Sequence, residues 1–79
     1  MRVNVLYFAV LREQRGLDHE VLESTAATVR DLYRGLVDRH GLTVAERSLA
    51  VSLNENLVRW DAALAEGDTV VFLPPVSGG

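Results

Sequence analysis

One amphipathic segment, residues 28–40, does most to limit the folds open to this chain. Its apolar side chains recur at the spacing of a single helical face, at Val29, Leu32, Tyr33, Leu36 and Val37. Thr28 suits the N-cap position, and Gly41 suits the left-handed position after the helix end. The sequence therefore predicts one main helix whose single apolar face must be covered by a sheet.

Short stretches on both sides of this helix alternate in the manner of half-buried β-strands. We expect strands at residues 2–8, 19–23, 49–53, 57–59 and 69–73, and a short helix at residues 9–15 that Gly16 ends. Residues 42–48 are expected to connect the main helix to the next strand, with a helical turn at 44–47. A mixed sheet of about five strands with one main helix packed across it is a two-layer α+β fold.

The first and last strands decide what lies on the outer face of that sheet. One helix covers one face only, so we place the odd-numbered residues of the first strand and the even-numbered residues of the last strand inward. If these strands are neighbours in the middle of the sheet, their outward side chains form one apolar patch, made of Leu6, Phe8, Val71 and Leu73. Leu57 is a candidate extension. Such a patch usually binds a partner, the alternative being that loops cover the residues one by one.

Length and charge narrow the functional classes. The chain has 79 residues, a net charge of −3 and a sequence pI near 5.2, which fits one small domain and argues against nucleic-acid binding. No apolar run approaches the roughly 18 residues of a membrane span, so we expect no membrane association. The N-terminus enters a strand pattern directly, without a signal peptide, and a cytoplasmic location is the expectation.

Conventional catalytic machinery is missing from the sequence. There is no cysteine, and all eight basic residues are arginine. No metal-ligand cluster, nucleophile–base pair or phosphate-binding loop is recognisable, so we expect no metal and no tightly bound cofactor. His19 and His40 are isolated and expected on the surface. Arg12 and Arg15 are expected on a solvated helix face, and the carboxylates are expected to be scattered solvated charges.

The absence of lysine has two interpretations. It can reflect a compositional bias toward arginine. Functionally, it leaves the chain without an ε-amine or thiol that could attack an activated group on itself, while the N-terminal amine remains a possible internal nucleophile.

The C-terminal segment differs in character from the rest of the chain. Two prolines end the last strand and favour an extended backbone, so we expect a domain over residues 1–73 and an extended tail over residues 74–79. The tail consists of Pro74, Pro75, Val76, Ser77, Gly78 and Gly79. From Pro75 to the terminal carboxylate it reaches roughly 13–15 Å, and glycine allows it to thread a channel too narrow for a Cβ atom. The alternative is an ordinary frayed terminus.

The reactive group that such a tail offers is the carboxylate of Gly79. A carboxylate resists nucleophilic attack until a partner converts it to an anhydride such as an acyl-adenylate. A sulfur nucleophile can then displace AMP and leave a thiocarboxylate at the end of the tail. In this hypothesis the chemistry takes place in a partner's site.

Residues 72–79, Phe-Leu-Pro-Pro-Val-Ser-Gly-Gly, resemble the C-terminal signature of the small subunits of molybdopterin synthase, the MoaD family. Residues 5–13, 51–54 and 67–72 also resemble that family, so the similarity covers nearly the whole chain. Leu73 stands where a phenylalanine is common. The resemblance implies a β-grasp (ubiquitin-like) fold and a subunit that is not an enzyme on its own.

The resemblance also implies the partners and the roles of individual residues. An ATP-dependent adenylating enzyme of the MoeB type would adenylate Gly79, and a sulfur donor such as a cysteine desulfurase would lead to the thiocarboxylate. The tail would then enter the large subunit, of the MoaE type, in a heterotetramer, and pass sulfur to cyclic pyranopterin monophosphate for molybdenum cofactor biosynthesis. Gly78 and Ser77 would line the inserted segment. Leu73, Phe8 and Leu57 match docking positions, and Arg12 matches a family arginine without an assigned role.

Three alternatives remain open at this point. The chain could carry sulfur for thiamine synthesis or tRNA thiolation, although those carriers generally lack the proline pair. It could be a ubiquitin-like modifier joined to lysines of other proteins. It could also be a plain binding module with an inert tail.

Overall fold

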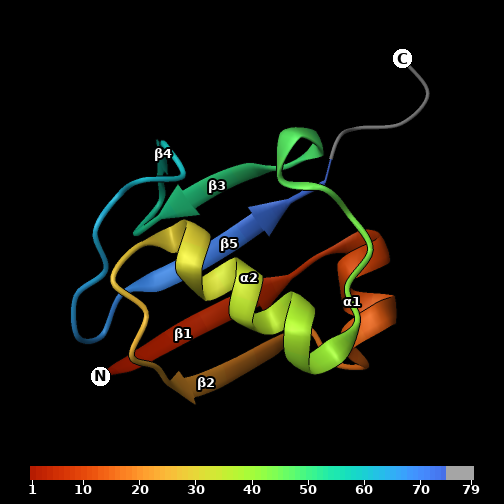
Figure 1. Ribbon diagram of the computed structural model, residues 1–79, viewed down its shortest axis with the longest axis horizontal. Helices are drawn as coiled ribbons and strands as arrows, with labels where there is room; N and C mark the ends of the chain where they lie inside the picture. Colours follow the sequence, from red (N-terminus) through yellow and green to blue (C-terminus); the bar gives the residue numbers. More distant parts are fainter. Residues whose placement is uncertain (75–79) are drawn as a thin grey trace.

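The computed structural model describes residues 1–74, and Figure 1 shows their arrangement. The elements in chain order are β1 (Arg2–Tyr7), α1 (Ala9–Arg15), β2 (His19–Glu23), α2 (Val29–His40), the 3₁₀ turn η1 (Glu46–Ser48), β3 (Ala50–Leu53), β4 (Asn56–Val58) and β5 (Thr69–Leu73). The strands form one mixed sheet in the order β2-β1-β5-β3-β4, and α2 lies across it. The predicted α+β architecture is confirmed.

The centre of the sheet is the parallel pair of β1 and β5, which are the first and last strands of the chain. Their register pairs Asn4 with Thr69 and Tyr7 with Phe72. The other three pairings are antiparallel, with β2 beside β1 and β3 between β5 and β4. The condition for an outward patch, that the first and last strands are neighbours, is therefore met.

Helix α2 has the caps and the buried apolar face that its sequence predicts. The side-chain oxygen of Thr28 accepts a hydrogen bond from the Asp31 backbone N–H at 3.2 Å, as an N-cap should. Gly41 follows the helix with a φ of 67° and donates its N–H to the Val37 carbonyl. Of the predicted apolar stripe, Val37 is partly buried and the other four residues are buried in the core.

The core lies between α2 and the inner face of the sheet. Val3, Val5, Tyr7, Val70 and Phe72 are all at most 1% exposed, which confirms the inward assignments on β1 and β5. The rings of Tyr33 and Phe72 lie 5.0 Å apart, and Trp60 stacks on Phe72 at 5.9 Å, so Trp60 covers an edge of the core.

Several boundaries differ from the sequence expectations. β1 ends at Tyr7, because Phe8 keeps an extended backbone but serves as the N-cap of α1. β3 begins at Ala50, and the helical turn of the connector lies at η1, two residues later than expected. Leu42, expected in the connector, is a buried core residue at 4% exposure.

Two turn residues in the β3–β4 hairpin take positive φ without being glycine. Asn54 has a φ of 51° and Glu55 a φ of 73°, as the two central residues of a tight hairpin turn require. Asn54 is held by its side chain, which donates to Asp68 and accepts from the Thr69 N–H. Those bonds tie the hairpin tip to the start of β5.

Candidate functional site

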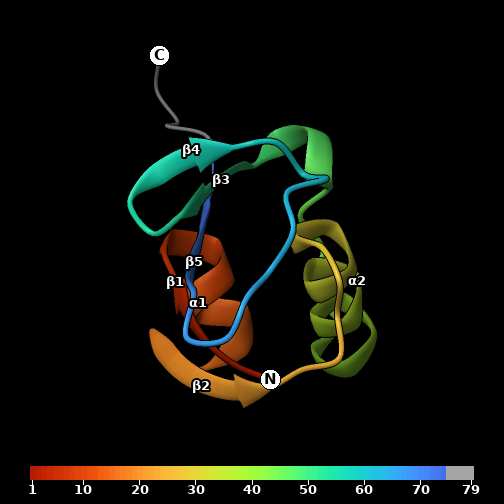
Figure 2. The ribbon, with the colours of Figure 1, turned by 90° about the vertical axis from the view of Figure 1, so that its left-hand side faces the viewer.

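The candidate site is the outer face of the sheet around the end of β5. Figure 2 shows α2 on one side of the sheet, and within residues 1–74 no helix covers the opposite side. α1 follows β1 and buries Leu11 in the same core as α2. The outer face is thus left without a covering layer from the described part of the chain.

One register row crosses this face from edge to edge. His19, Leu6, Val71, Ser52 and Leu57 are successive Cα partners on β2, β1, β5, β3 and β4. Side chains of such partners point to the same face. Phe8 and Leu73 follow directly after the paired residues Tyr7 and Phe72, so they extend the face toward the point where the chain leaves β5.

We call Leu6, Phe8, Leu57, Val71 and Leu73 the outer apolar patch. Leu57 is 73% exposed and Phe8 43% exposed, whereas the other three are half-buried. Leu6 and Val71 have neighbouring strands on both sides, and Leu73 lies beside Ala50 of β3. The structure therefore brings the five predicted docking residues onto one face, and no loop buries any of them. Their role in docking stays a prediction.

Two further exposed apolar residues, Val10 and Val21, are not predicted from the sequence pattern. Val21 on β2 is 52% exposed and is the Cα partner of Asn4 on the outer face. Val10, on α1, is 36% exposed. Val21 lies two residues after His19 on β2, so the sequence indicates that both side chains point to the same face of the sheet. Which face that is becomes clear only from the register between β2 and β1.

The predicted reactive tail begins at the edge of this patch. Pro74 follows β5 and is half-buried. Pro75, Val76, Ser77, Gly78 and Gly79 lie outside the described residues, and their predicted insertion into a partner remains a prediction.

On the inner side of the sheet, which faces the core, the side chains of Glu20, Tyr7 and Arg15 form a hydrogen-bonded group. The Glu20 carboxylate accepts hydrogen bonds from the Tyr7 hydroxyl at 2.6 Å and from Arg15 Nε and Nη2 at 2.8 and 2.7 Å. The expectations of a solvated Arg15 and of scattered carboxylates are wrong here, because the α1–β2 loop brings both groups over Tyr7. Arg12 is exposed, as expected.

The pairing shifts the ionisation of this group of residues. Partial burial acts to raise the pKa of Glu20, but the hydrogen bonds from Arg15 and Tyr7 outweigh it and leave the pKa below its ordinary value of 4.5. Burial, followed by the hydrogen bond to Glu20, raises the pKa of the Tyr7 hydroxyl far above its ordinary value. Tyr7 is therefore held neutral, as a hydrogen-bond donor and not as a base.

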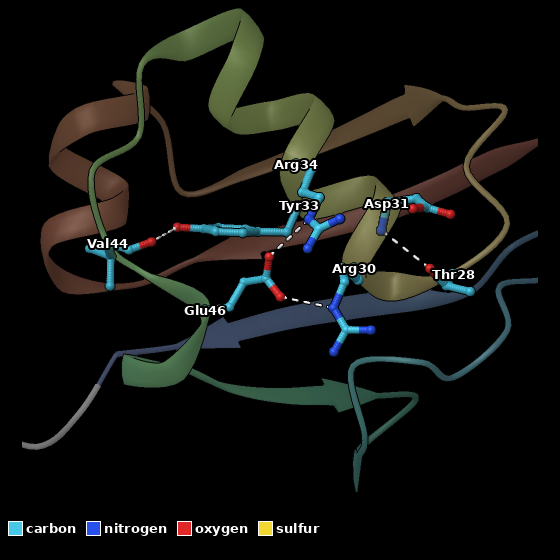
Figure 3. A network of polar contacts seen from close by, with 7 residues as sticks. All are labelled: Thr28, Arg30, Asp31, Tyr33, Arg34, Val44 and Glu46. Carbon is cyan, nitrogen blue, oxygen red and sulfur yellow. Dashed lines mark hydrogen bonds and ion pairs between the residues drawn. The ribbon is translucent and has the colours of Figure 1, made fainter.

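A second carboxylate joins η1 to α2 (Figure 3). Glu46 accepts from Arg30 Nε at 2.9 Å and from Arg34 Nε at 3.1 Å, and the nearby Tyr33 hydroxyl donates to the Val44 carbonyl at 2.6 Å. Burial acts to raise the pKa of Glu46, but the two arginine hydrogen bonds lower it overall. Both networks hold elements together and keep Glu20 and Glu46 ionised at neutral pH, so neither of these two carboxylates is poised for acid–base work.

The remaining possible sites are occupied or incomplete. At the start of α2 the N–H groups of Val29 and Arg30 donate to the carbonyls of Ala62 and Trp60, so this helix end does not offer them to an anion. Within residues 1–74 no group of three His, Asp or Glu side chains could hold a metal ion. In the same residues no helix has the length and apolarity to cross a bilayer.

Comparison with known families gives the decisive observation. A family model described as the ThiS family matches residues 5–79. The chain belongs to the ThiS family. The matched region includes the whole outer apolar patch and the C-terminal diglycine.

Individual relatives of this ThiS-family chain are more specific. It is 38% identical to the molybdopterin synthase sulfur carrier subunit of Haemophilus influenzae and 36% identical to that of Escherichia coli, with 98% of this chain and 99% of each relative covered. Among solved structures it is similar to a putative molybdopterin converting factor subunit 1 from Pyrococcus furiosus, at 34% identity and a TM-score of 0.79 over 96% of this chain and 99% of the other. This agreement also confirms the β-grasp fold.

Two further structural neighbours bear on partners. One chain of the complex of subunits 1 and 2 of the Helicobacter pylori molybdopterin-converting factor is 29% identical, with a TM-score of 0.71 and full coverage of both chains. SAMP1 of Haloferax volcanii, a small archaeal modifier protein, is 27% identical, with a TM-score of 0.80 and full coverage of both chains. The fold is therefore shared by converting-factor subunits and modifier proteins.

Proposed function

We propose that this ThiS-family protein is the sulfur carrier subunit of a molybdopterin synthase. The observation that carries the proposal is its 38% identity, over almost the full length of both chains, to a relative with that name. The uncovered outer apolar patch at the end of β5 supports it, since a carrier whose tail acts inside another protein needs a docking surface beside that tail. The Helicobacter pylori complex is a precedent for a second subunit as the occupant.

In this proposal the chemistry belongs to the Gly79 carboxylate. A carboxylate oxygen attacks the α-phosphate of ATP in an adenylating partner of the MoeB type, and pyrophosphate leaves. The terminal sulfur of a donor persulfide, such as that of a cysteine desulfurase, then attacks the acyl carbon and AMP leaves. A thiol reductant cleaves the S–S bond of the resulting acyl disulfide, which leaves the thiocarboxylate on Gly79 and the donor as a disulfide with the reductant. The large subunit, of the MoaE type, receives the tail and catalyses sulfur transfer to cyclic pyranopterin monophosphate. The carrier itself is not a catalyst and requires no bound cofactor.

Intact mass spectrometry of the protein purified from its own cells tests this chemistry. We expect a species heavier than the calculated chain by the difference between one sulfur and one oxygen atom. With a matched large subunit and cyclic pyranopterin monophosphate, that species should yield molybdopterin. A variant with one residue added after Gly79 is the control and should give neither product. Sulfur transfer by the extended variant would overturn the proposal.

A second candidate function is a protein modifier, which the similarity to SAMP1 favours. Immunoblotting a cell lysate for high-mass adducts separates the two functions. Free thiocarboxylate without adducts supports the carrier, whereas adducts without thiocarboxylate support the modifier. Activity in thiamine or tRNA thiolation, without molybdopterin formation, would instead place the chain among the other sulfur carriers.

A further inference from the structure

The basic residues of this protein share a property that the proposed function does not explain. All eight are arginine, and the 79 residues contain neither lysine nor cysteine. A guanidinium stays protonated and is not a nucleophile, whereas an ε-amine or a thiolate near an activated acyl group would capture it. We propose that the folded body is built so that an activated Gly79 cannot acylate its own chain. This inference rests on the proposed function only in assuming that Gly79 becomes activated.

The one amine left to consider is the α-amine of Met1. It donates to the Ser24 carbonyl at 2.9 Å and lies 3.6 Å from a carboxylate oxygen of Glu23. The amine is thus engaged at the far end of β2. Its position relative to β5 decides whether the tail can reach it.

The parallel pairing of β1 and β5 places Met1 and the end of β5 at opposite ends of the sheet (Figure 1). Asn4 is the partner of Thr69, Met1 lies three residues before Asn4, and Leu73 lies four residues after Thr69. The separation is therefore seven residue rises, or about 23 Å along the strands.

The six residues after Leu73 cannot span that separation backwards. Fully extended they cover about 20–22 Å, and β5 points away from Met1. A reversal of direction uses about four residues in a tight turn, which leaves two residues for the return path. The Met1 amine therefore lies beyond the reach of Gly79. The parallel register keeps this amine away from the activated group, and the rest of the chain offers no lysine or cysteine to attack it.

The same register identifies one near and one far position for an introduced lysine. Val58 pairs with Val51, and Val51 pairs with Phe72. Arg59 follows Val58 as Leu73 follows Phe72, so the backbones of Arg59 and Leu73 lie level with each other, two strands or about 10 Å apart. Arg2 lies two residues before Asn4, which places it about 20 Å from Leu73. Both side chains are well exposed, and each has a carboxylate oxygen near its Nε, at 3.4 Å in Asp61 and 3.6 Å in Glu23. Arg59→Lys and Arg2→Lys are thus a matched pair.

The experiment uses the full 79-residue chain with a Gly79 α-thioester, made by thiol cleavage of an intein fusion. At mildly alkaline pH an amine attacks the acyl carbon, a C–N bond forms, and the thiol leaves with the amine proton. The wild-type thioester should give only the hydrolysed acid, whereas added free lysine should capture it. Arg59→Lys should also give an internal amide, lighter than the acid by one water, at least about tenfold faster than Arg2→Lys.

Intact mass spectrometry over time gives both rates, and peptide mapping locates the amide. An internal amide in the wild-type chain would overturn the inference, as would equal rates for the two lysine variants. Because the thioester is made without the adenylating partner, the outcome is independent of whether the chain carries sulfur. Failure of the proposed function would instead appear as missing thiocarboxylate in the cell-purified protein.

Discussion

The two faces of the sheet are made by the same strands and differ in almost every other respect. On the inner face, the residues of β1 and β5 are at most 1% exposed, and in the described residues no buried side-chain polar atom lacks a hydrogen-bond partner. On the outer face, the intervening residues of the same strands are only half-buried, and Leu57 and Phe8 are exposed. The described residues cover one face completely, and the other face carries apolar side chains that they leave uncovered.

This difference separates stability from recognition within a very small molecule. A chain of 79 residues needs most of its apolar side chains to build a stable core. Apolar side chains that stay uncovered on one face therefore indicate a role in binding rather than in folding. The patch is also supported rigidly, because its central members lie on the paired strands β1 and β5. Substitutions on the inner face should therefore lower stability, and those on the outer face should lower binding.

The largest effect is expected at Phe72 on the inner face. Phe72→Ala removes a fully buried ring packed against Tyr33 and Trp60 and should cost about 3–5 kcal/mol of unfolding free energy. Leu57→Ala on the outer face is the control and should stay within about 0.5 kcal/mol of the wild type. Urea denaturation measures both, and a Leu57→Ala cost comparable to that of Phe72→Ala would mean that the outer face also belongs to the core.

The next effect concerns binding through the outer face. Phe8→Asp places a charge on the outer apolar patch beside the end of β5 and should weaken binding of the large subunit by more than about 2 kcal/mol. Its own stability should change little, since Phe8 is 43% exposed. Ala63→Asp, at an exposed residue beside the start of α2, is the control for added charge. Unchanged affinity for Phe8→Asp in isothermal titration calorimetry would remove Phe8 from the interface.

The sequence was sufficient for features that depend on local periodicity. The stripe of α2 and the alternation on β1 and β5 assigned the core and the outward residues correctly, because side-chain direction follows directly from secondary structure. What it could not provide was tertiary register. The pairing of Arg15 with Glu20, and the position of His19 in the same row as Leu6, depend on how the α1–β2 loop returns the chain to β1. The insertion of residues 75–79 into a partner depends on a second protein and stays a prediction.

A smaller effect tests whether the polar pairing on the inner side contributes to stability. Glu20→Gln removes the charge that accepts bonds from Arg15 and Tyr7 and should cost about 1–2 kcal/mol at neutral pH. Because the pKa of Glu20 is lowered in the folded state, its contribution is complete above its ordinary value of 4.5 and is lost as pH falls through the lowered pKa. The difference between wild type and variant should therefore disappear in acid.

The matched control for that prediction lies on the same strand. Glu23 is 73% exposed and pairs loosely with Arg2 and with the Met1 amine, each at 3.6 Å, so Glu23→Gln should change stability by less than about 0.5 kcal/mol at any pH. Thermal unfolding across a pH series measures both variants. A Glu20→Gln difference that persists at low pH would show that packing, and not charge, makes the contribution.

The smallest effect is expected on the solvent side of α2, which belongs to neither face of the sheet. A Cβ atom added at Gly35 would meet no atom within 4 Å apart from the local backbone of its own helix, so close packing against another element does not explain this glycine. Gly35→Ala should therefore raise the unfolding free energy by about 0.5–1 kcal/mol, through better helix propensity and a less flexible unfolded chain. Gly41→Ala is the opposite control, because a φ of 67° strains alanine and should lower stability. If Gly35→Ala stabilises the fold but weakens large-subunit binding, recognition extends beyond the outer face, and the division between the two faces of the sheet is incomplete.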